Sequence, residues 1–104
     1  MPGIDINFFI RQANKLTEKI EKRKAELAAE TVTGSAANMV TVTLNGIQEI
    51  QSIKIDKKAL EANDQAMLED MLVAAVNAGL ANSRELMRRE LEKVSNGVKI
   101  PGVT

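Results

Sequence analysis

The sequence predicts an α+β domain in which a long helix, a three-stranded antiparallel meander and a second long helix follow one another. Apolar residues recur at helical spacing over residues 6–29 and again over residues 64–95, which indicates the two helices. Between them, residues 39–44 alternate strictly between apolar and threonine side chains, the period of a half-buried strand. Asn45 and Gly46 then join this run to an isoleucine-rich run, and this pair is typical of the loop of a β-hairpin.

The first helix is expected over about residues 6–29, with Asp5 or Asn7 as its cap. At 1.5 Å per residue it is about 36 Å long. Its apolar seam is narrow, because successive members lie four, three, four, three and four residues apart. The members are Phe9, Ala13, Leu16, Ile20, Arg23 and Leu27. We therefore expect the helix to pack on one partner and to present its other faces to water, with six basic and three acidic residues over residues 11–26.

Residues 30–33 favour a short first strand, and residues 34–38 are expected to form the turn that leads into the main hairpin. The loop of the main hairpin has two alternatives. A two-residue loop puts Ile50 on the threonine face of the preceding strand, whereas a three-residue loop with a bulge at Gly46 puts it on the valine face. We favour the bulged loop. Ile50 and Ile53 are three residues apart, so either an irregularity follows Ile50 or both faces of the sheet are covered.

After the third strand, the carboxylate of Asp56 is expected to cap a single helical turn at residues 57–60. The second long helix is expected to begin after Asn63 or Asp64 and to end near Ser95, a length of about 48 Å. Its first half carries a wide apolar face, with small residues, that we expect to be buried. This face consists of Met67, Leu68, Met71, Leu72, Ala75, Val76, Gly79 and Leu80. Its second half is expected to project as a charged arm.

Both helices are too long for the sheet between them. A seven-residue strand spans only about 23 Å, so the helices overhang the sheet and one protomer cannot cover both. Together with the small-residue face of the second helix, this predicts a homodimer. We expect a single domain over residues 1–97 and a C-terminal tail over residues 98–104, because Gly97 suits the position past a helix end and Pro101 cannot continue a helix.

The composition excludes several classes of function. Fourteen basic and fourteen acidic residues give a formal net charge of zero, and the chain contains neither cysteine nor histidine. Disulfides, thiolate metal sites and imidazole catalysis are therefore excluded, and the carboxylates and serines form no convincing catalytic set. We expect no enzymatic activity, no metal and no cofactor. No apolar run approaches the roughly 20 residues of a membrane helix, so we expect no membrane association and a cytoplasmic location.

An ordered set of short segments covers nearly the whole chain. After the first helix come VTG at residues 32–34, MVTVTLNG at 39–46, IKID at 53–56, LED at 68–70, AA at 74–75, NA at 77–78 and VSNG at 94–97, with a Pro-Gly pair in the tail. This order closely resembles the YbaB/EbfC family of bacterial nucleoid-associated DNA-binding proteins. The resemblance implies an intertwined homodimer whose helical arms project like tweezers. It also implies a non-catalytic role on double-stranded DNA, at the nucleoid in the cytoplasm.

Two segments depart from the pattern of that family. Its members usually carry several glycines in the first hairpin turn, where residues 35–37 of this chain are Ser-Ala-Ala. Many members also have basic residues near the third strand, where residues 50–52 of this chain are Ile-Gln-Ser. The resemblance therefore gives no support to a DNA contact by the third strand.

Two functions from different classes remain open. The leading one is sequence-tolerant DNA binding, in which arginine and lysine side chains of the arms contact phosphates. If the two long helices run antiparallel, the start of the first lies beside the end of the second, and each arm gains a cluster of five cations. The expected DNA-binding residues are Arg11, Lys15, Arg88, Arg89 and Lys93. The alternative is a non-enzymatic dimeric module that binds a protein partner, favoured by the zero net charge and by the near absence of aromatic residues that stack on bases.

Overall fold

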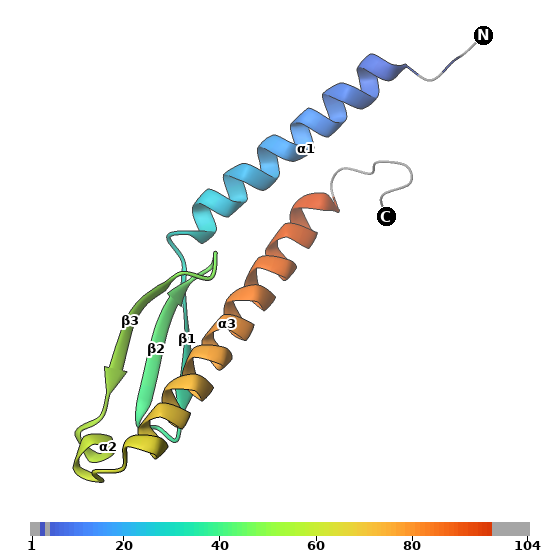
Figure 1. Ribbon diagram of the computed structural model, residues 1–104. Helices are drawn as coiled ribbons and strands as arrows, with labels where there is room; N and C mark the ends of the chain where they lie inside the picture. The colour runs from blue at the N-terminus through green and yellow to red at the C-terminus, as the bar shows by residue number, and fades with distance from the viewer. Residues whose placement is uncertain (1–2, 4, 97–104) are drawn as a thin grey trace.

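The computed structural model describes residue 3 and residues 5–96, and it shows two long helices joined through a small sheet (Figure 1). The helices are α1 (Ile6–Leu27), α2 (Lys57–Glu61) and α3 (Gln65–Ser95), and the strands are β1 (Thr31–Ala36), β2 (Val40–Asn45) and β3 (Ile50–Ile55). The strands form one antiparallel sheet in the order β1-β2-β3. The predicted α+β class is therefore confirmed. The predicted tail, and the domain boundary next to it, lie outside the described residues.

An aspartate caps each helix at its start. The side chain of Asp5 accepts a hydrogen bond from the backbone N–H of Phe8 at the start of α1 (3.2 Å). Asp56 does the same for Lys58 at the start of α2, and Asp64 for Met67 at the start of α3. Such caps stabilise a helix by about 1 kcal/mol each. Both predicted alternatives are thus settled in favour of aspartate over asparagine.

The first hairpin turn differs from the prediction. Residues 34–36 belong to β1 rather than to the turn, which is made by Ala37 and Asn38 with φ of 52° and 55°. Gly34 pairs with Val42 and faces α3, where an added Cβ would collide with the backbone of Gly79. The glycine is therefore needed for the close approach of a helix and not for a turn.

Residues 46–48 form a three-residue loop between Asn45 and Glu49, which is the loop length favoured from the sequence. The backbone N–H of Asn45 donates to the carbonyl of Glu49 (3.0 Å), and Gln48 holds the left-handed conformation with φ of 63°. The bulge was predicted at Gly46, but Gln48 and not Gly46 has the left-handed conformation in this loop. The predicted position of the bulge is therefore wrong. The N–H of Gly46 instead donates to the carbonyl of Leu27 (2.9 Å), and an added Cβ would lie only 2.7 Å from the same oxygen.

An irregularity in β3 does follow Ile50, which was the first of the two predicted alternatives. Leu44 pairs with Ile50 while Thr43 pairs with Ser52, so Gln51 is an extra residue in β3. The extra residue lets Ile50 and Ile53 share the face of the sheet toward α3, because residues paired across strands point to the same side.

The core lies where α3 crosses the inner face of β1 and β2 (Figure 1). Its buried members are Val40, Val42, Leu44, Ala59, Met71 and Ala75. The expectation that the first half of α3 is buried throughout is wrong for a single chain, since Leu72 and Val76 are only half-buried. The physical reason is that α3 leaves the inner face of β3 largely uncovered, and Ile50 and Ile53 remain 48% and 47% exposed.

Candidate nucleic-acid interface

Beyond the sheet, α1 and the second half of α3 (residues 81–95) run side by side and antiparallel; we call this pair the arm (Figure 1). The rest of the described chain, from β1 to residue 80, is the sheet end. The two helices thus meet the condition on which the predicted cluster of cations was based. The chain extends 76 Å in its longest direction but only 22 and 15 Å in the other two. An elongated shape of this kind exposes most of the arm to solvent.

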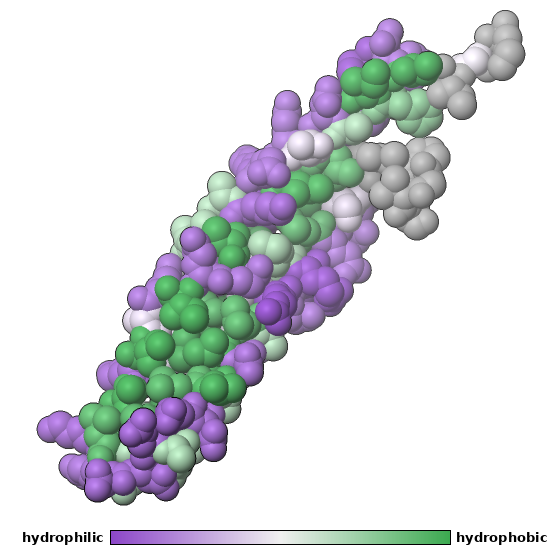
Figure 2. All heavy atoms as spheres, viewed as in Figure 1, coloured by the Kyte–Doolittle hydropathy of each residue, from purple (hydrophilic) through white to green (hydrophobic). Residues whose placement is uncertain are grey.

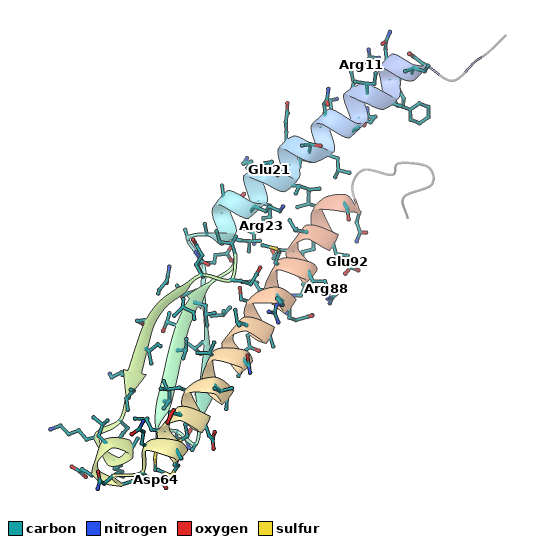
Figure 3. All side chains as sticks on the ribbon, in the orientation of Figure 1. Arg11, Glu21, Arg23, Asp64, Arg88 and Glu92 are labelled. Carbon is teal, nitrogen blue, oxygen red and sulfur yellow. The ribbon has the colours of Figure 1, made fainter. Side chains whose placement is uncertain are left out.

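A group of charged side chains, which we call the clasp, joins the two helices of the arm. Arg23 extends from α1 toward α3 (Figure 3), where its Nη2 donates to Glu90 Oε1 at 2.6 Å. Arg23 Nη1 also lies 2.8 Å from Glu30 Oε2, and Lys93 Nζ lies 2.7 Å from Glu90 Oε2. The hydrogen bonds from Lys93 and Arg23 lower the pKa of Glu90, and the hydrogen bond to Glu90 raises the pKa of Arg23. The clasp fixes how α1 and α3 are offset along their axes.

Because of this offset, the start of α1 projects past the end of α3. Arg11 lies 12 residues before Arg23, whereas α3 continues for only five residues after Glu90. At 1.5 Å per residue, α1 reaches about 18 Å beyond the clasp by Arg11, while α3 ends about 7.5 Å beyond it. We call residues 6–15 the tip of the arm.

The structure does not bring the five predicted DNA-binding residues together. Arg11 and Lys15 lie at the tip, whereas Arg88 and Arg89 lie on the other side of the clasp. Arg11 and Arg88 are about 20 Å apart along the arm, by the rise of 1.5 Å per residue. The expected cluster of five cations on one arm is therefore wrong. The positions of the cations depend on how far the two helices are offset, and this offset is set by a tertiary contact, the clasp.

Two of the predicted cations are engaged with carboxylates. Arg88 donates to Glu85 (Nη2 to Oε1, 2.7 Å) and to Glu92 (Nη1 to Oε2, 2.7 Å), as the labelled side chains in Figure 3 indicate for Glu92. The hydrogen bond to Glu85 raises the pKa of Arg88, and the same bond lowers the pKa of Glu85. Lys93 is paired with Glu90 in the clasp. The two pairs of Arg88 are exposed and therefore weak, so a phosphate could replace either of its carboxylate partners.

Arg89 differs from its neighbour Arg88, because within the described residues it makes no ion pair. It is exposed and lines a shallow surface pocket of about 370 Å³ together with Val32 and Asn82. Arg84, which the sequence analysis did not select, is likewise exposed and forms no ion pair within residues 5–96. These two arginines are the available cations on α3.

A row of four cations lies along one face of α1. Its members, which we call the cationic row, are Arg11, Lys15, Lys19 and Lys22. Their spacings of four, four and three residues place them on one side of a helix. All four are exposed, and none forms an ion pair in the part of the chain that the structure describes. Glu18 and Glu26 share this side nearer the clasp, so the excess of positive charge is greatest at the tip.

Lys19 and Lys22 are not among the predicted DNA-binding residues, although the sequence contains the signal for them. The excess of basic residues on the first helix does not by itself say which of them share a face. Their spacing from Arg11 and Lys15 carries that information, because residues three and four apart are neighbours on a helix.

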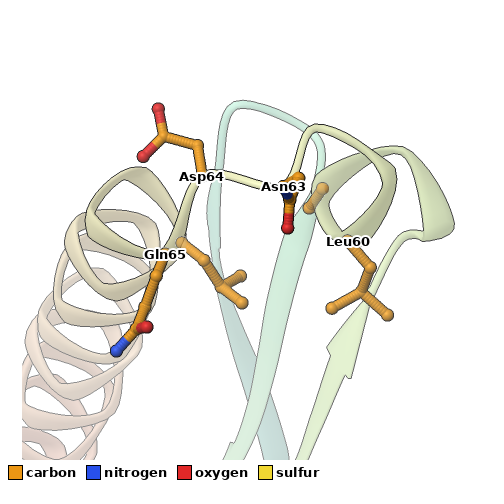
Figure 4. Close-up of a pocket in the computed structure, with 6 residues that line it drawn as sticks. Leu60, Asn63, Asp64 and Gln65 are labelled. Atoms are coloured by element: carbon orange, nitrogen blue, oxygen red, sulfur yellow. The ribbon is translucent and has the colours of Figure 1, made fainter.

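The pocket drawn in Figure 4 lies at the opposite end of the molecule, between α2 and the start of α3. It has a volume of about 160 Å³, whereas ligand sites usually measure about 300–1,000 Å³. Its one carboxylate, Asp64, caps α3 and points away from Leu60. This pocket therefore offers no pair of groups for acid–base catalysis. Among residue 3 and residues 5–96, no three acidic side chains converge on a metal position.

An elongated α+β protein with a row of exposed cations on a helical arm has the character of a nucleic-acid-binding protein. The model of the YbaB/EbfC DNA-binding family matches residues 1–98. The chain belongs to this family, which is a DNA-binding family and not a known enzyme family. The resemblance noted from the sequence is thus confirmed. None of the helices in the described ranges is long and apolar enough to cross a membrane.

Several proteins are similar to this chain over most of their length. A nucleoid-associated protein of Myxococcus xanthus is 66% identical over 105 residues, which cover all of both chains. A nucleoid-associated protein of Syntrophobacter fumaroxidans is 41% identical over 95 residues, or 90% of this chain and 86% of that one. The crystal structure of the uncharacterized protein HP0035 from Helicobacter pylori aligns with a TM-score of 0.74 at 23% identity. That alignment covers 88% of this chain and 96% of the other, and it supports the fold alone.

Proposed function

We propose that this chain is a nucleoid-associated protein that binds double-stranded DNA through phosphate contacts, with little dependence on base sequence. The cationic row on α1 carries the proposal, because it presents four exposed cations on one face and none of them forms an ion pair within the described residues. Membership of a DNA-binding family and the names of the relatives support it. We propose as well that residues 1–97 form one domain and that the protein is located at the nucleoid.

The cationic row is long enough to reach several phosphates of one DNA strand. From Arg11 to Lys22 the row is about 16 Å long, and one strand of a duplex presents a phosphate about every 3.4 Å of helix axis. Four cations can therefore each find a phosphate. Lysine acts as a point charge and does not distinguish bases, so contacts of this kind favour binding to unrelated sequences.

The five residues expected from the sequence enter this proposal with unequal weight. Arg11 and Lys15 are the outer half of the cationic row, and Arg89 provides a further contact on α3. Arg88 and Lys93 contribute only where a phosphate replaces their carboxylate partners. DNA contacts are thus distributed along the arm instead of being gathered at one cluster.

We propose further that the protein works as a homodimer with two projecting arms. The inner face of β3 and the neighbouring side of α3 form an apolar surface within the sheet end, where apolar side chains gather (Figure 2). Ile53, Leu72, Val73 and Val76 line a pocket of about 320 Å³ on it, and Val73 is 60% exposed. A second α3 of the same kind would cover this surface and give the intertwined arrangement expected from the sequence. Contiguous exposed apolar surfaces often mark an interface.

The alternative function, a non-enzymatic dimeric module that binds a protein partner, has one specific observation in its favour. Arg88 forms ion pairs with Glu85 and Glu92, and Lys93 forms one with Glu90. These pairs leave the α3 side of the arm nearly neutral. The cationic row on α1 has no such compensation at the tip, and for this reason we place DNA binding first.

The test compares the parent protein with two charge-reversal variants on several unrelated duplexes over a range of salt concentrations. Reversal at the tip (Arg11→Glu with Lys15→Glu) should weaken binding to every duplex, and it should reduce the slope of log affinity against log salt by about 1.8 for each arm. Reversal at the sheet end (Lys57→Glu with Lys58→Glu) is the matched control and should leave both quantities unchanged. If the parent binds no duplex at low salt, DNA binding fails and the protein-partner alternative takes its place.

A further inference from the structure

The chain contains two aromatic residues, and they lie next to each other in the first turn of α1 with different surroundings. Phe9 lies on the side of the helix that carries the apolar seam and is half-buried, although α1 projects past the end of α3 at this position. Phe8 points to another side of the helix and is 47% exposed. Its ring meets the ring of Phe9 edge to face, with centroids 5.9 Å apart and planes at 73°. The seam accounts for Phe9 but gives no structural role to Phe8.

Phe8 continues the cationic row. It lies three residues before Arg11, so Phe8 and the four cations follow one another at spacings of three, four, four and three residues on one face. Between Asp5, whose carboxylate accepts a hydrogen bond from the backbone N–H of Phe8, and Glu18 the helix carries only basic charges. Arg11, which is labelled near the start of α1 in Figure 3, is the cation of the row nearest to Phe8 in the sequence.

We propose that Phe8 is a wedge that presses against a base step of bound DNA and partly unstacks it, while the cationic row holds the adjacent phosphates. The proposal rests on the proposed DNA-binding function. A phenyl ring gains nothing from a phosphate, and the apolar parts of a duplex are its bases. Phe8 lies at the end of the cationic row, and the row follows the phosphates. From this position the end of the helix, and not its side, can reach the bases.

The wedge has two measurable consequences. Loss of contact between an aromatic ring and a base should weaken binding by roughly 5- to 100-fold, without changing the salt slope, because the ring releases no counterion. Wedges of this kind kink a duplex by about 20–90°, so bound DNA should be bent. In the proposed dimer each arm carries one wedge, and two kinks are expected for each complex that engages both arms.

The experiment uses the full-length protein with three single variants. Phe8→Ala removes the ring, and Phe8→Leu keeps an apolar wedge. Ile10→Ala is the matched control, because Ile10 is 51% exposed at the same tip but lies about 200° around the helix from Phe8. Affinity is measured over salt, unstacking by the fluorescence of 2-aminopurine within the duplex, and bending by energy transfer between dyes at the duplex ends.

The parent, Phe8→Leu and Ile10→Ala should all increase the 2-aminopurine signal and bend the duplex, whereas Phe8→Ala should do neither while keeping the salt slope of the parent. If Phe8→Ala bends and unstacks DNA as the parent does, the wedge is overturned and phosphate binding stands. A lower melting temperature or a changed oligomeric state in Phe8→Ala would instead assign the ring to the fold, which also overturns the wedge. A parent that binds no duplex defeats the proposed function itself, so the two failures are distinguishable.

Discussion

The sheet end and the arm are held together by different kinds of contact. In the sheet end, Val40, Val42 and Leu44 are completely buried, and the backbones of Gly34 and Gly79 touch where α3 crosses β1. In the arm, the helices meet along a narrow seam, and a group of ion pairs around Arg23 sets their offset. Figure 2 shows polar side chains along this second region and also at the α2 end of the molecule.

This difference separates stability from function. Close packing tolerates little change, because a buried group that no longer fits has nowhere to move. Exposed charges can be exchanged at a cost of less than about 0.5 kcal/mol. Substitutions in the sheet end should therefore alter folding, and substitutions in the arm should alter binding with the fold intact.

The largest effect is expected at the crossing of α3 and β1. Gly34→Val should destabilise the protein by about 3 kcal/mol or more, because the new side chain would collide with the backbone of α3 and not with a flexible side chain. Ser35→Val is the matched control on the exposed face of the same strand and should change the free energy of unfolding by no more than about 0.5 kcal/mol. Denaturant titration measures both.

This comparison is informative because strand propensity predicts the opposite result. Valine favours strands and glycine does not, so propensity alone expects Gly34→Val to stabilise β1. Equal or greater stability in Gly34→Val would show that α3 can move away from β1, contrary to the close contact described above.

The sheet end could largely be predicted from the sequence, because its signals are local. The alternation of valine and threonine gives β2, and the aspartates before each helix give the caps. The role of Gly34 could not be predicted in this way. A run of glycine, serine and alanine before asparagine favours a turn locally, whereas the need for glycine arises from Gly79, which lies 45 residues away in the chain.

The arm could be predicted only in part. The seam of α1 follows from the periodicity, but the offset of the two helices depends on where Arg23 meets Glu90. No local pattern encodes that meeting, and an error of a few residues in the offset moves a cation by several ångströms. For the same reason we predicted from the sequence that Arg11 lies close to Arg88, whereas the structure separates the two residues.

The clasp should make the docking of α1 on α3 sensitive to acid. The pKa of Glu90 is lowered from its usual value near 4.5 by Lys93 and Arg23. A carboxylate with a lowered pKa in the folded state contributes stability above its usual pKa, and this contribution is lost as the pH falls through the lowered value. As the pH falls below about 4.5 and through the lowered pKa of Glu90, α1 should therefore separate from α3 while the sheet end stays folded.

Spin labels on the exposed positions Asn14→Cys and Asn96→Cys measure the separation of the two helices of the arm. The distance should increase over this range of pH, and Glu90→Gln should show the larger distance already at neutral pH. A distance that does not change with pH in the parent would mean that the apolar seam, and not the clasp, holds the arm together.

The smallest effect on stability is expected for substitutions of two adjacent arginines, Arg88 and Arg89. Comparing them tests whether an arginine that is already in an ion pair contributes less to DNA binding than one that is not. Arg89→Gln should reduce the slope of log affinity against log salt by about 0.9 for each arm, because Arg89 has no carboxylate partner in the described chain and can hold a phosphate outright. Arg88→Gln should reduce it by clearly less, since Arg88 must first leave Glu85 and Glu92. Both variants should unfold within about 0.5 kcal/mol of the parent. Equal losses at the two positions would show that the ion pairs of Arg88 open freely when DNA arrives, and the charge compensation seen on α3 would then have no influence on where DNA binds.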